Sequence, residues 1–177
     1  MKKPFLPPRW FVRGAWRTHR LLLRATGDRV GLRPPVPGRC GMLRLTTTGR
    51  RSGEPRAVVL CYIEDGDRLV TLAMNGWDRA DPAWWLNLRA NGSATVDLAG
   101  GGSRPVTAAV ATGEERERLW AALHDYEGYG DIDAFAARRG RETAVVVLSP
   151  AVADPAPAAA RASQRTVPDA PTTTGSR

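Results

Sequence analysis

The feature that most constrains this chain is the nine-residue stretch 45–53, which reads Leu-Thr-Thr-Thr-Gly-Arg-Arg-Ser-Gly and follows a short apolar run. Glycines allow a sharp turn that presents successive backbone N–H groups, an arrangement that favours a negatively charged ligand. The hydroxyls add neutral donors, and the arginines add forked, permanently charged donors suited to phosphate and carboxylate. The stretch therefore predicts a strand that runs into an anion-binding turn, although Arg-Arg-Ser-Gly is also ordinary hairpin chemistry.

Other sites with a clear sequence signature are not expected. The Gly-x-x-x-x-Gly-Lys spacing of a phosphate-binding P-loop is absent. The two histidines, His19 and His124, are far apart and lack companion ligands, so we expect no metal site. Cys40 and Cys61 have no CxxC spacing, which favours a reducing cytoplasm. No signal peptide and no run long enough to span a membrane is visible, so we predict a cytoplasmic protein.

The net charge of +8 at pH 7 is unevenly distributed along the chain. Residues 1–44 contain eleven lysines and arginines against Asp28 alone, whereas residues 45–150 contain twelve arginines against fifteen acidic residues. The positive charge therefore belongs to the N-terminal segment. Because the rest of the chain is not basic, we expect no nucleic-acid partner.

The N-terminal segment has the pattern of a basic amphipathic helix over residues 9–26. Its arginines fall on one stripe at about 3.6 residues per turn, and aromatic and aliphatic side chains cover most of the remaining arc. The stripe comprises Arg9, Arg13, Arg17, Arg20 and Arg24. Such a helix can lie on the inner face of the cell membrane, bound to anionic lipid. Alternatively, it packs its apolar arc on the rest of the protein, which we predict below to be a barrel, or on a second subunit.

The middle of the chain reads as short strands with helices between them. The expected strands are 41–48, 56–63, 68–75, 94–98, 104–111 and 143–148. Asp65-Gly66 predicts a tight hairpin, and Asp81, Thr112 or Gly113, and Asp131 are expected at helix starts, with Asp81 as an N-cap before Pro82. This pattern predicts an α+β fold built on a closed or split β-barrel of about six strands.

Three segments are expected along the chain. Residues 1–38 form the basic helix and a proline-rich arm, and residues 39–150 form the barrel domain. Residues 151–177 are rich in Ala, Pro and Thr without periodicity, which is typical of a disordered tail.

Two further blocks follow the 45–53 stretch: Ala-Met-Asn-Gly-Trp at 73–77 and Pro-Ala-Trp-Trp-Leu-Asn-Leu at 82–88. In this order the blocks resemble the deazaflavin-dependent nitroreductase family, which includes quinone reductases. Its members read Leu-Thr-Thr-Thr-Gly-Arg-Lys/Arg-Ser-Gly, then Ala-Ser-Asn-Gly-Gly, then Pro-Ala-Trp-Tyr-x-Asn-Leu. The resemblance covers about residues 34–150.

The resemblance implies a split β-barrel like that of FMN-binding proteins, which binds reduced coenzyme F420. Such proteins transfer a hydride from the deazaflavin to quinones, nitroaromatics or other electron-poor acceptors. The cofactor carries the chemistry, so no catalytic side chain is expected. Two alternatives stay open: a reductase of the same fold that uses FMN, and a non-catalytic protein that carries F420. A homodimer is expected on fold analogy.

Matching the family motif residue by residue gives a cofactor-binding set. The phosphate and polyglutamate tail are expected at Thr48, Arg50, Arg51, Ser52 and Gly53, with Arg56 and Val58 beside the cofactor on the next strand. The deazaflavin ring is expected along Asn75 and Gly76, with the other side closed by Pro82, Trp84 and Asn87.

The acceptor side departs from the family pattern. Met74 stands for the usual serine and Trp77 for the usual second glycine, which places large side chains beside the ring and would reshape the acceptor pocket. The family's spaced tyrosines correspond to Tyr126 and Tyr129, and Phe135 takes the third place without a hydroxyl. These five residues form the expected substrate-binding set.

Overall fold

In the computed structural model, the described residues are 31–76 and 78–151. The predicted basic helix at residues 9–26, Trp77 and the predicted tail beyond residue 151 lie outside this part of the chain. Residues 31–38 form the end of the arm, where Arg33 bridges to Met42 and Val36 bridges to Arg39. The arm thus doubles back before the first strand.

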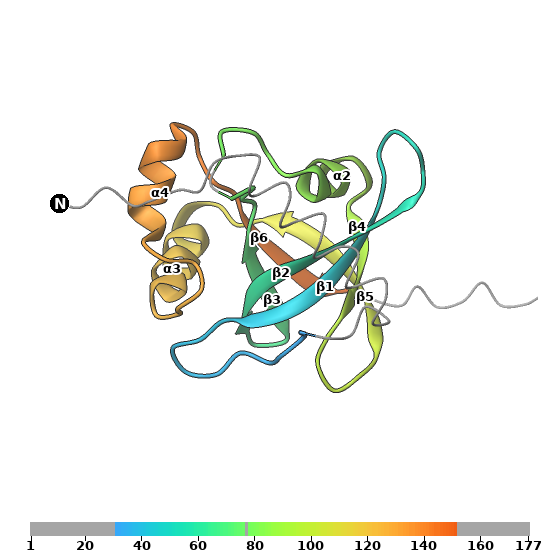
Figure 1. Cartoon of the computed structure of the whole chain (residues 1–177), viewed down its shortest axis with the longest axis horizontal. Helices are drawn as coiled ribbons and strands as arrows, with labels where there is room; N and C mark the ends of the chain where they lie inside the picture. Colours follow the sequence, from blue (N-terminus) through green and yellow to red (C-terminus); the bar gives the residue numbers. More distant parts are fainter. Residues whose placement is uncertain (1–30, 77, 152–177) are drawn as a thin grey trace, which may run out of the picture.

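Six antiparallel strands form a closed barrel (Figure 1). In chain order they are β1 (Gly41–Thr48), β2 (Pro55–Asp65), β3 (Arg68–Leu72), β4 (Ser93–Asp97), β5 (Ser103–Val110) and β6 (Val145–Pro150). Around the barrel the order is β1-β2-β3-β6-β5-β4, and β4 closes the ring against β1. The predicted α+β barrel of six strands is confirmed.

Glycines form two of the connections between strands, and the first of them, the Asp65-Gly66 hairpin, was predicted. Asp65 pairs with Arg68 across the β2–β3 turn, where Gly66 has φ 67°. Gly100, Gly101 and Gly102, all with positive φ, connect β4 to β5. Positive φ is readily accessible to glycine but strained for most other residues, so these turns set the strand register locally.

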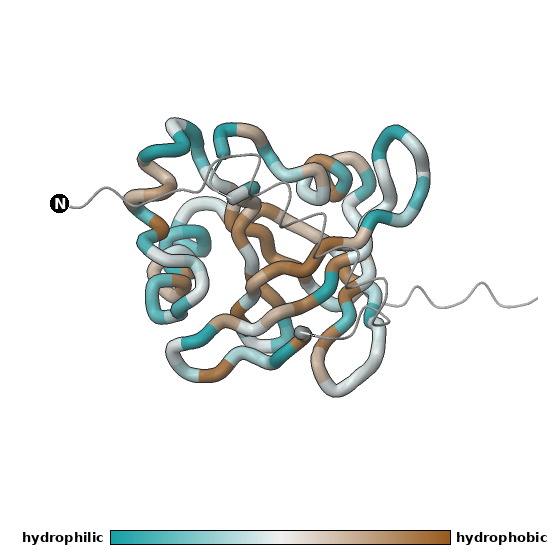
Figure 2. The backbone as a smooth tube through the Cα atoms, in the orientation of Figure 1, coloured by the Kyte–Doolittle hydropathy of each residue, from teal (hydrophilic) through white to brown (hydrophobic). Residues whose placement is uncertain are grey.

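Two apolar clusters lie on either side of the barrel wall. Along β6, Val146 and Leu148 join the cluster inside the barrel, while Val145 and Val147 join the cluster beneath the outer helices. Successive side chains of a strand point to opposite faces, so a strand buried on both faces reads as a continuous apolar run. Figure 2 shows the hydrophobic segments gathered in the barrel strands.

Three described helices cover the barrel: α2 (Ala83–Asn91), α3 (Gly113–His124) and α4 (Ile132–Arg139). α2 contributes Trp84, Trp85 and Leu88 to the inner cluster. α3 and α4 pack on the outer cluster and lie together on one side of the barrel (Figure 1). No helix in residues 31–76 and 78–151 has the length and apolar character needed to cross a membrane.

The predicted caps have different outcomes. Asp131 caps α4 as predicted, because its carboxylate accepts the Ala134 N–H at 2.9 Å. The prediction for Asp81 was wrong: Pro82 occupies the N-cap position of α2 without a side-chain cap bond. The Asp81 carboxylate instead accepts hydrogen bonds from Arg139 and Arg141, so a long-range ion pair takes the place of the local cap.

β1 has the predicted ends, and the ends of the other strands differ from the predicted ones by at most three residues. The largest difference is in β3, which was expected to run to Asn75 and ends at Leu72. The chain turns there because the Met74 N–H bonds back to the Leu72 carbonyl at 2.8 Å. β6 begins at Val145, two residues later than predicted, and continues to Pro150.

Candidate functional site: an arginine loop tied to helix α2

The arginine-rich stretch forms a closed turn between β1 and β2, here called the arginine loop (residues 49–54). The Gly49 N–H donates to the Glu54 carbonyl at 2.8 Å, and the Gly53 N–H donates to the Gly49 carbonyl at 2.7 Å. Gly53 has φ 71°, and a Cβ at Gly49 would lie 2.9 Å from the Ser52 hydroxyl oxygen. Both glycines are therefore required by the shape of this turn.

Helix α2 holds the arginine loop through Asn87. The Asn87 side-chain oxygen accepts from the Arg50 backbone N–H at 3.2 Å and from its guanidinium at 3.3 Å. Its amide nitrogen donates to the Thr47 hydroxyl at 3.1 Å. Asn87 is buried, so these bonds satisfy a polar group that would otherwise be costly inside the protein. Asn91, one turn later, donates to the Thr48 carbonyl at 3.1 Å.

The loop presents cationic and hydroxyl donors to solvent. Arg56 donates to the Ser52 hydroxyl oxygen at 3.3 Å, and both side chains are exposed. Arg51 is exposed, and no residue in the described part of the chain hydrogen-bonds to its guanidinium. Arg51 therefore has all its donors available for an anion, whereas Arg50 is partly engaged by Asn87.

Asn75 and Gly76 lie in a turn after β3. The Asp78 N–H donates to the Asn75 carbonyl at 3.1 Å, and Gly76 within the turn has φ 57°. Both residues are exposed, whereas Ala73 just before them is fully buried. The turn leads directly into α2, so it, the arginine loop and α2 lie along one edge of the barrel (Figure 1).

Arg139 fixes the segment that carries this turn. From α4, its buried guanidinium donates to the carbonyls of Ala73 and Asp78 at 3.1 and 2.9 Å and to Asp81 Oδ1 at 2.6 Å. The backbone before and after Asn75 is therefore held by one side chain, and this leaves Asn75 and Gly76 as the exposed tip.

The remaining residues of the expected cofactor-binding set are apolar and less exposed. Pro82 and Trp84 are buried, and Val58 is half-buried beside the inner cluster. Trp84 and Trp85 meet edge to face with centroids 6.2 Å apart. Such ring pairs add packing energy of about 0.5–1.5 kcal/mol beyond the area that they bury.

Three of the expected acceptor-side residues converge on the outer cluster. Tyr129 is buried there, and Met74 and Tyr126 pack against it while half-buried. Burial raises the pKa of Tyr129 well above its usual value, so its hydroxyl stays protonated at neutral pH. Phe135 is half-buried and lies close to Gly130, while Trp77 lies outside the described residues.

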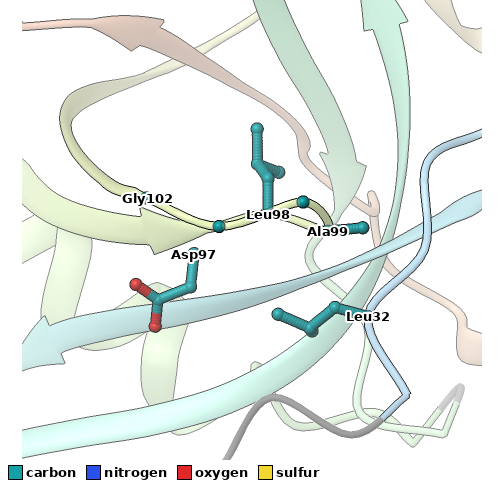
Figure 3. A pocket seen from close by; sticks show the side chains of 7 residues that line it. Leu32, Asp97, Leu98, Ala99 and Gly102 are labelled. Atoms are coloured by element: carbon teal, nitrogen blue, oxygen red, sulfur yellow. The ribbon is translucent and has the colours of Figure 1, made fainter.

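A separate shallow pocket lies at the β4–β5 turn (Figure 3). Leu32, Asp97, Leu98 and Ala99 line it with the three following glycines. Arg44 pairs with Asp97, whereas Thr47, near the arginine loop, pairs with Ala94 at the start of β4. The pocket is therefore at the opposite end of β1 from the arginine loop and is not part of the same site.

The match to known proteins identifies the family. The family model of F420H(2)-dependent quinone reductase matches residues 15–150. The chain belongs to this family. One relative, an F420H(2)-dependent quinone reductase of Mycobacterium tuberculosis, is 32% identical over 135 residues, which cover 75% of this chain and 88% of that protein.

Solved structures agree with the family. An F420-H2 dependent reductase superposes with a TM-score of 0.53 at 30% identity and covers 61% of this chain and 93% of its own. A second structure, described as a domain-swapped dimer, superposes with a TM-score of 0.57 at 29% identity and covers 81% of this chain and 100% of its own. Their similarity supports the barrel over most of the chain.

The sequence analysis gave no site role to four residues that hold the candidate site in place. Thr47 and Asn91 hold the arginine loop against α2, and Arg139 and Asp81 hold the segment after β3. The spacing of four between Asn87 and Asn91 places both on one helix face and was an available signal. No local signal marked Arg139, which lies 58 positions from Asp81 in the sequence.

Proposed function

We propose that this protein is an oxidoreductase that binds reduced coenzyme F420 and transfers a hydride to a quinone. The observation that carries the proposal is the arginine loop, which α2 holds through the buried Asn87 while Arg51 stays open to solvent. The family match to F420H(2)-dependent quinone reductases supports the same activity. Nitroaromatics are a second acceptor class, as expected from the resemblance.

The donors of the loop fit the chemistry of the cofactor's tail. Coenzyme F420 carries a phosphate and several carboxylates, and Arg51, Arg56 and the Ser52 hydroxyl offer forked cationic and neutral donors to such groups. We assign the tail to the loop residues Thr48, Arg50, Arg51, Ser52 and Gly53, with Arg56 and Val58 beside it. When bound, the cofactor supplies the hydride, and the protein supplies binding, orientation and electrostatics.

The ring is assigned to the turn after β3 and the start of α2. Asn75 and Gly76 are exposed at the tip of that turn, so a ligand can reach them from solvent. Pro82 and Trp84 are enclosed and offer an apolar wall, and Asn87 sets the distance between this wall and the arginine loop. Together these residues would hold one end of the ring while leaving a face for the acceptor.

The acceptor is assigned to the side of Met74, Trp77, Tyr126, Tyr129 and Phe135. Met74 and Tyr126 are half-buried against one apolar cluster, which suits a flat apolar acceptor such as a quinone. A quinone that receives a hydride also takes up one proton to become the hydroquinone. Tyr129 is buried and its hydroxyl is protonated, so we assign it to the wall of the acceptor side and not to the exposed surface.

Assembly and location are part of the same proposal. The domain-swapped dimer among the solved structures supports a homodimer for this chain. The basic helix predicted at residues 9–26 supports peripheral contact of a cytoplasmic protein with an anionic membrane, where lipid-soluble quinones reside.

Two measurements test the cofactor and the activity. Calorimetric titration of the full chain with coenzyme F420 and with FMN, side by side, should give at least tenfold tighter binding of F420. Anaerobic mixing with reduced F420 and a short-chain benzoquinone should then give quinone-dependent loss of the reduced cofactor. Tighter FMN binding would support the FMN reductase instead. F420 binding without turnover on quinones or nitroaromatics would support the non-catalytic carrier.

A further inference from the structure

The two cysteines of the chain lie next to each other although they are 21 positions apart in the sequence. The sulfurs of Cys40 and Cys61 are 2.8 Å apart, and both are free thiols. Cys40 directly precedes β1, and Cys61 lies in β2, where it pairs with Met42. The β1–β2 ladder therefore holds the two sulfurs together in the folded protein.

The two sulfurs have different surroundings. Cys40 is fully buried, whereas Cys61 is partly exposed, so a small oxidant in solvent reaches Cys61 first. The hydrogen bond with Cys61, together with nearby Arg33 and Arg39, lowers the pKa of Cys40 to about 7, although burial opposes this. The same hydrogen bond and burial raise the pKa of Cys61. A Cys40 thiolate at neutral pH can therefore act as a general base, which takes up the Cys61 proton as the Cys61 sulfur forms its bond to an oxidant.

We propose that Cys40 and Cys61 form an oxidisable dithiol that peroxides convert into a disulfide. The Cys61 sulfur attacks one peroxide oxygen as its proton passes to Cys40, the O–O bond breaks, and hydroxide leaves when the oxidant is hydrogen peroxide. The Cys40 thiol then attacks the Cys61 sulfenic acid; the S–S bond forms, the S–O bond breaks, and the hydroxyl leaves with the Cys40 proton as water. The two sulfurs lose two electrons in total, which the peroxide gains.

The pair is connected to the proposed acceptor side. The Cys40 N–H donates to the Glu127 carbonyl at 3.2 Å, and the Glu127 N–H donates to the Gly38 carbonyl at 2.7 Å. Gly128 packs so closely that a Cβ there would lie 2.6 Å from the Cys40 sulfur. A Cys40–Cys61 disulfide therefore links β2 to the backbone that supports Tyr126 and Tyr129. Any effect of this disulfide on acceptor binding rests on the proposed function, whereas the formation of the disulfide does not.

Intact mass spectrometry of the full chain tests the dithiol. After brief treatment with a small molar excess of hydrogen peroxide, the protein should lose the mass of two hydrogen atoms and regain it with dithiothreitol. Peptide mapping should yield one linked pair containing Cys40 and Cys61. Because the chain has two cysteines, no other intramolecular pairing exists. An unchanged mass with both thiols open to alkylation, a sulfinic acid on either cysteine, or a chain-to-chain disulfide would each overturn the proposal.

Single substitutions test the order of attack. Cys40→Ser removes both the resolving thiol and the group that takes up the Cys61 proton, so the Cys61 sulfenic acid should form more slowly but persist and react with dimedone. Cys61→Ser leaves the buried Cys40, and dimedone labelling should be at least tenfold lower under the same peroxide treatment. Equal labelling of the two variants would contradict the assignment of Cys61 as the sulfur that meets the oxidant. These readouts involve no cofactor, so failure of the reductase proposal leaves them unaffected.

Discussion

Arg139 of α4 and Asp81, which precedes α2, form an ion pair with 2.6 Å between Nη2 and Oδ1. The Arg139 side chain has no exposed surface, and it also donates to the Ala73 and Asp78 carbonyls and to the Thr143 hydroxyl. A buried guanidinium is tolerated only when its donors are satisfied and its charge is paired. The pair therefore fixes the proposed ring-binding turn, which carries Asn75 and Gly76, relative to the outer helices.

Arg139→Met should destabilise the protein strongly. It leaves the Asp81 carboxylate and two carbonyls without their shared donor, and breaking such a pair costs about 3–5 kcal/mol. Arg141→Ala is the matched control, because Arg141 binds the same carboxylate at 2.9 Å but is about half exposed. Its loss should cost less than about 1 kcal/mol. Urea unfolding of both variants measures the difference, and similar small losses would contradict a structural role for Arg139.

Arg51→Ala should weaken cofactor binding without affecting the fold. It removes a charge-assisted donor that no described residue engages, which should cost about 1.5–3 kcal/mol of binding free energy. Arg118→Ala is the control: it removes the same charge from α3, where Arg118 pairs with Asp65. Calorimetric titration with F420 should separate the two variants by at least tenfold in Kd. Unchanged affinity in Arg51→Ala would contradict the tail assignment.

Asn87→Ala should loosen the arginine loop from α2. The substitution removes the hydrogen bonds that Asn87 makes to the Thr47 hydroxyl and to the Arg50 N–H, which should lower the free energy of unfolding by about 1–3 kcal/mol. Asn91→Ala removes a more exposed bond to the Thr48 carbonyl and should cost less than about 1 kcal/mol. Thermal unfolding compares their stabilities. F420 affinity should fall more in Asn87→Ala than in Asn91→Ala. The reverse order would contradict the proposal that Asn87 positions the arginine loop.

The stability of the protein should depend on the ionisation of Asp65. Arg118, and then Arg68, hydrogen-bond to its carboxylate and lower the pKa of Asp65 below its usual value. A lowered pKa gives stability that is present above the unfolded-state pKa of about 3.9 and is lost as the pH falls through the folded-state pKa. Asp65→Asn should therefore cost about 0.5–1 kcal/mol at pH 7 and little near pH 2.

Denaturant unfolding at the two pH values checks the Asp65 prediction. Asp67→Asn is the control, since Asp67 lies in the same turn and is exposed. It should change stability little at either pH. A loss in Asp65→Asn that is equal at pH 7 and pH 2 would show that packing rather than charge is responsible.

How far the sequence predicted the site depends on the range of the contacts. The fold followed from local signals: the continuous apolar run along β6, the glycine at Gly66 and the Asp131 cap all act within a few residues. The family motif predicted Asn87 as a cofactor-binding residue but not its hydrogen bonds to Arg50, because that contact spans 37 positions. Spacing along one strand or helix carries no information about which element packs opposite.

Asp81 shows why a local rule failed. An aspartate before Pro-x-x at a helix start is a good cap candidate, and the sequence contained no competing signal. In the folded chain Arg139, at the end of α4, and Arg141, just after it, reach the carboxylate, and their charge outweighs a backbone N–H as a partner. The Cys40–Cys61 contact was missed for the same reason, since CxxC spacing detects only neighbours along one segment.

The basic helix predicted at residues 9–26 should bind anionic membranes reversibly. Each arginine near such a surface contributes about 1 kcal/mol, and added salt should weaken the attraction by shortening the Debye length. In co-sedimentation with vesicles of phosphatidylglycerol and phosphatidylcholine, the full chain should therefore pellet at low salt and return to the supernatant at high salt.

Two variants separate charge from packing at this helix. Replacing Arg9, Arg13, Arg17, Arg20 and Arg24 with glutamine keeps the apolar arc and should abolish vesicle binding while leaving the melting temperature unchanged. Deleting residues 1–26 should also abolish binding. If the helix instead packs on the barrel or a second subunit, the deletion lowers the melting temperature and the full chain stays in the supernatant at low salt. That result would remove the membrane from the proposed function and leave the quinone to reach the barrel from solution.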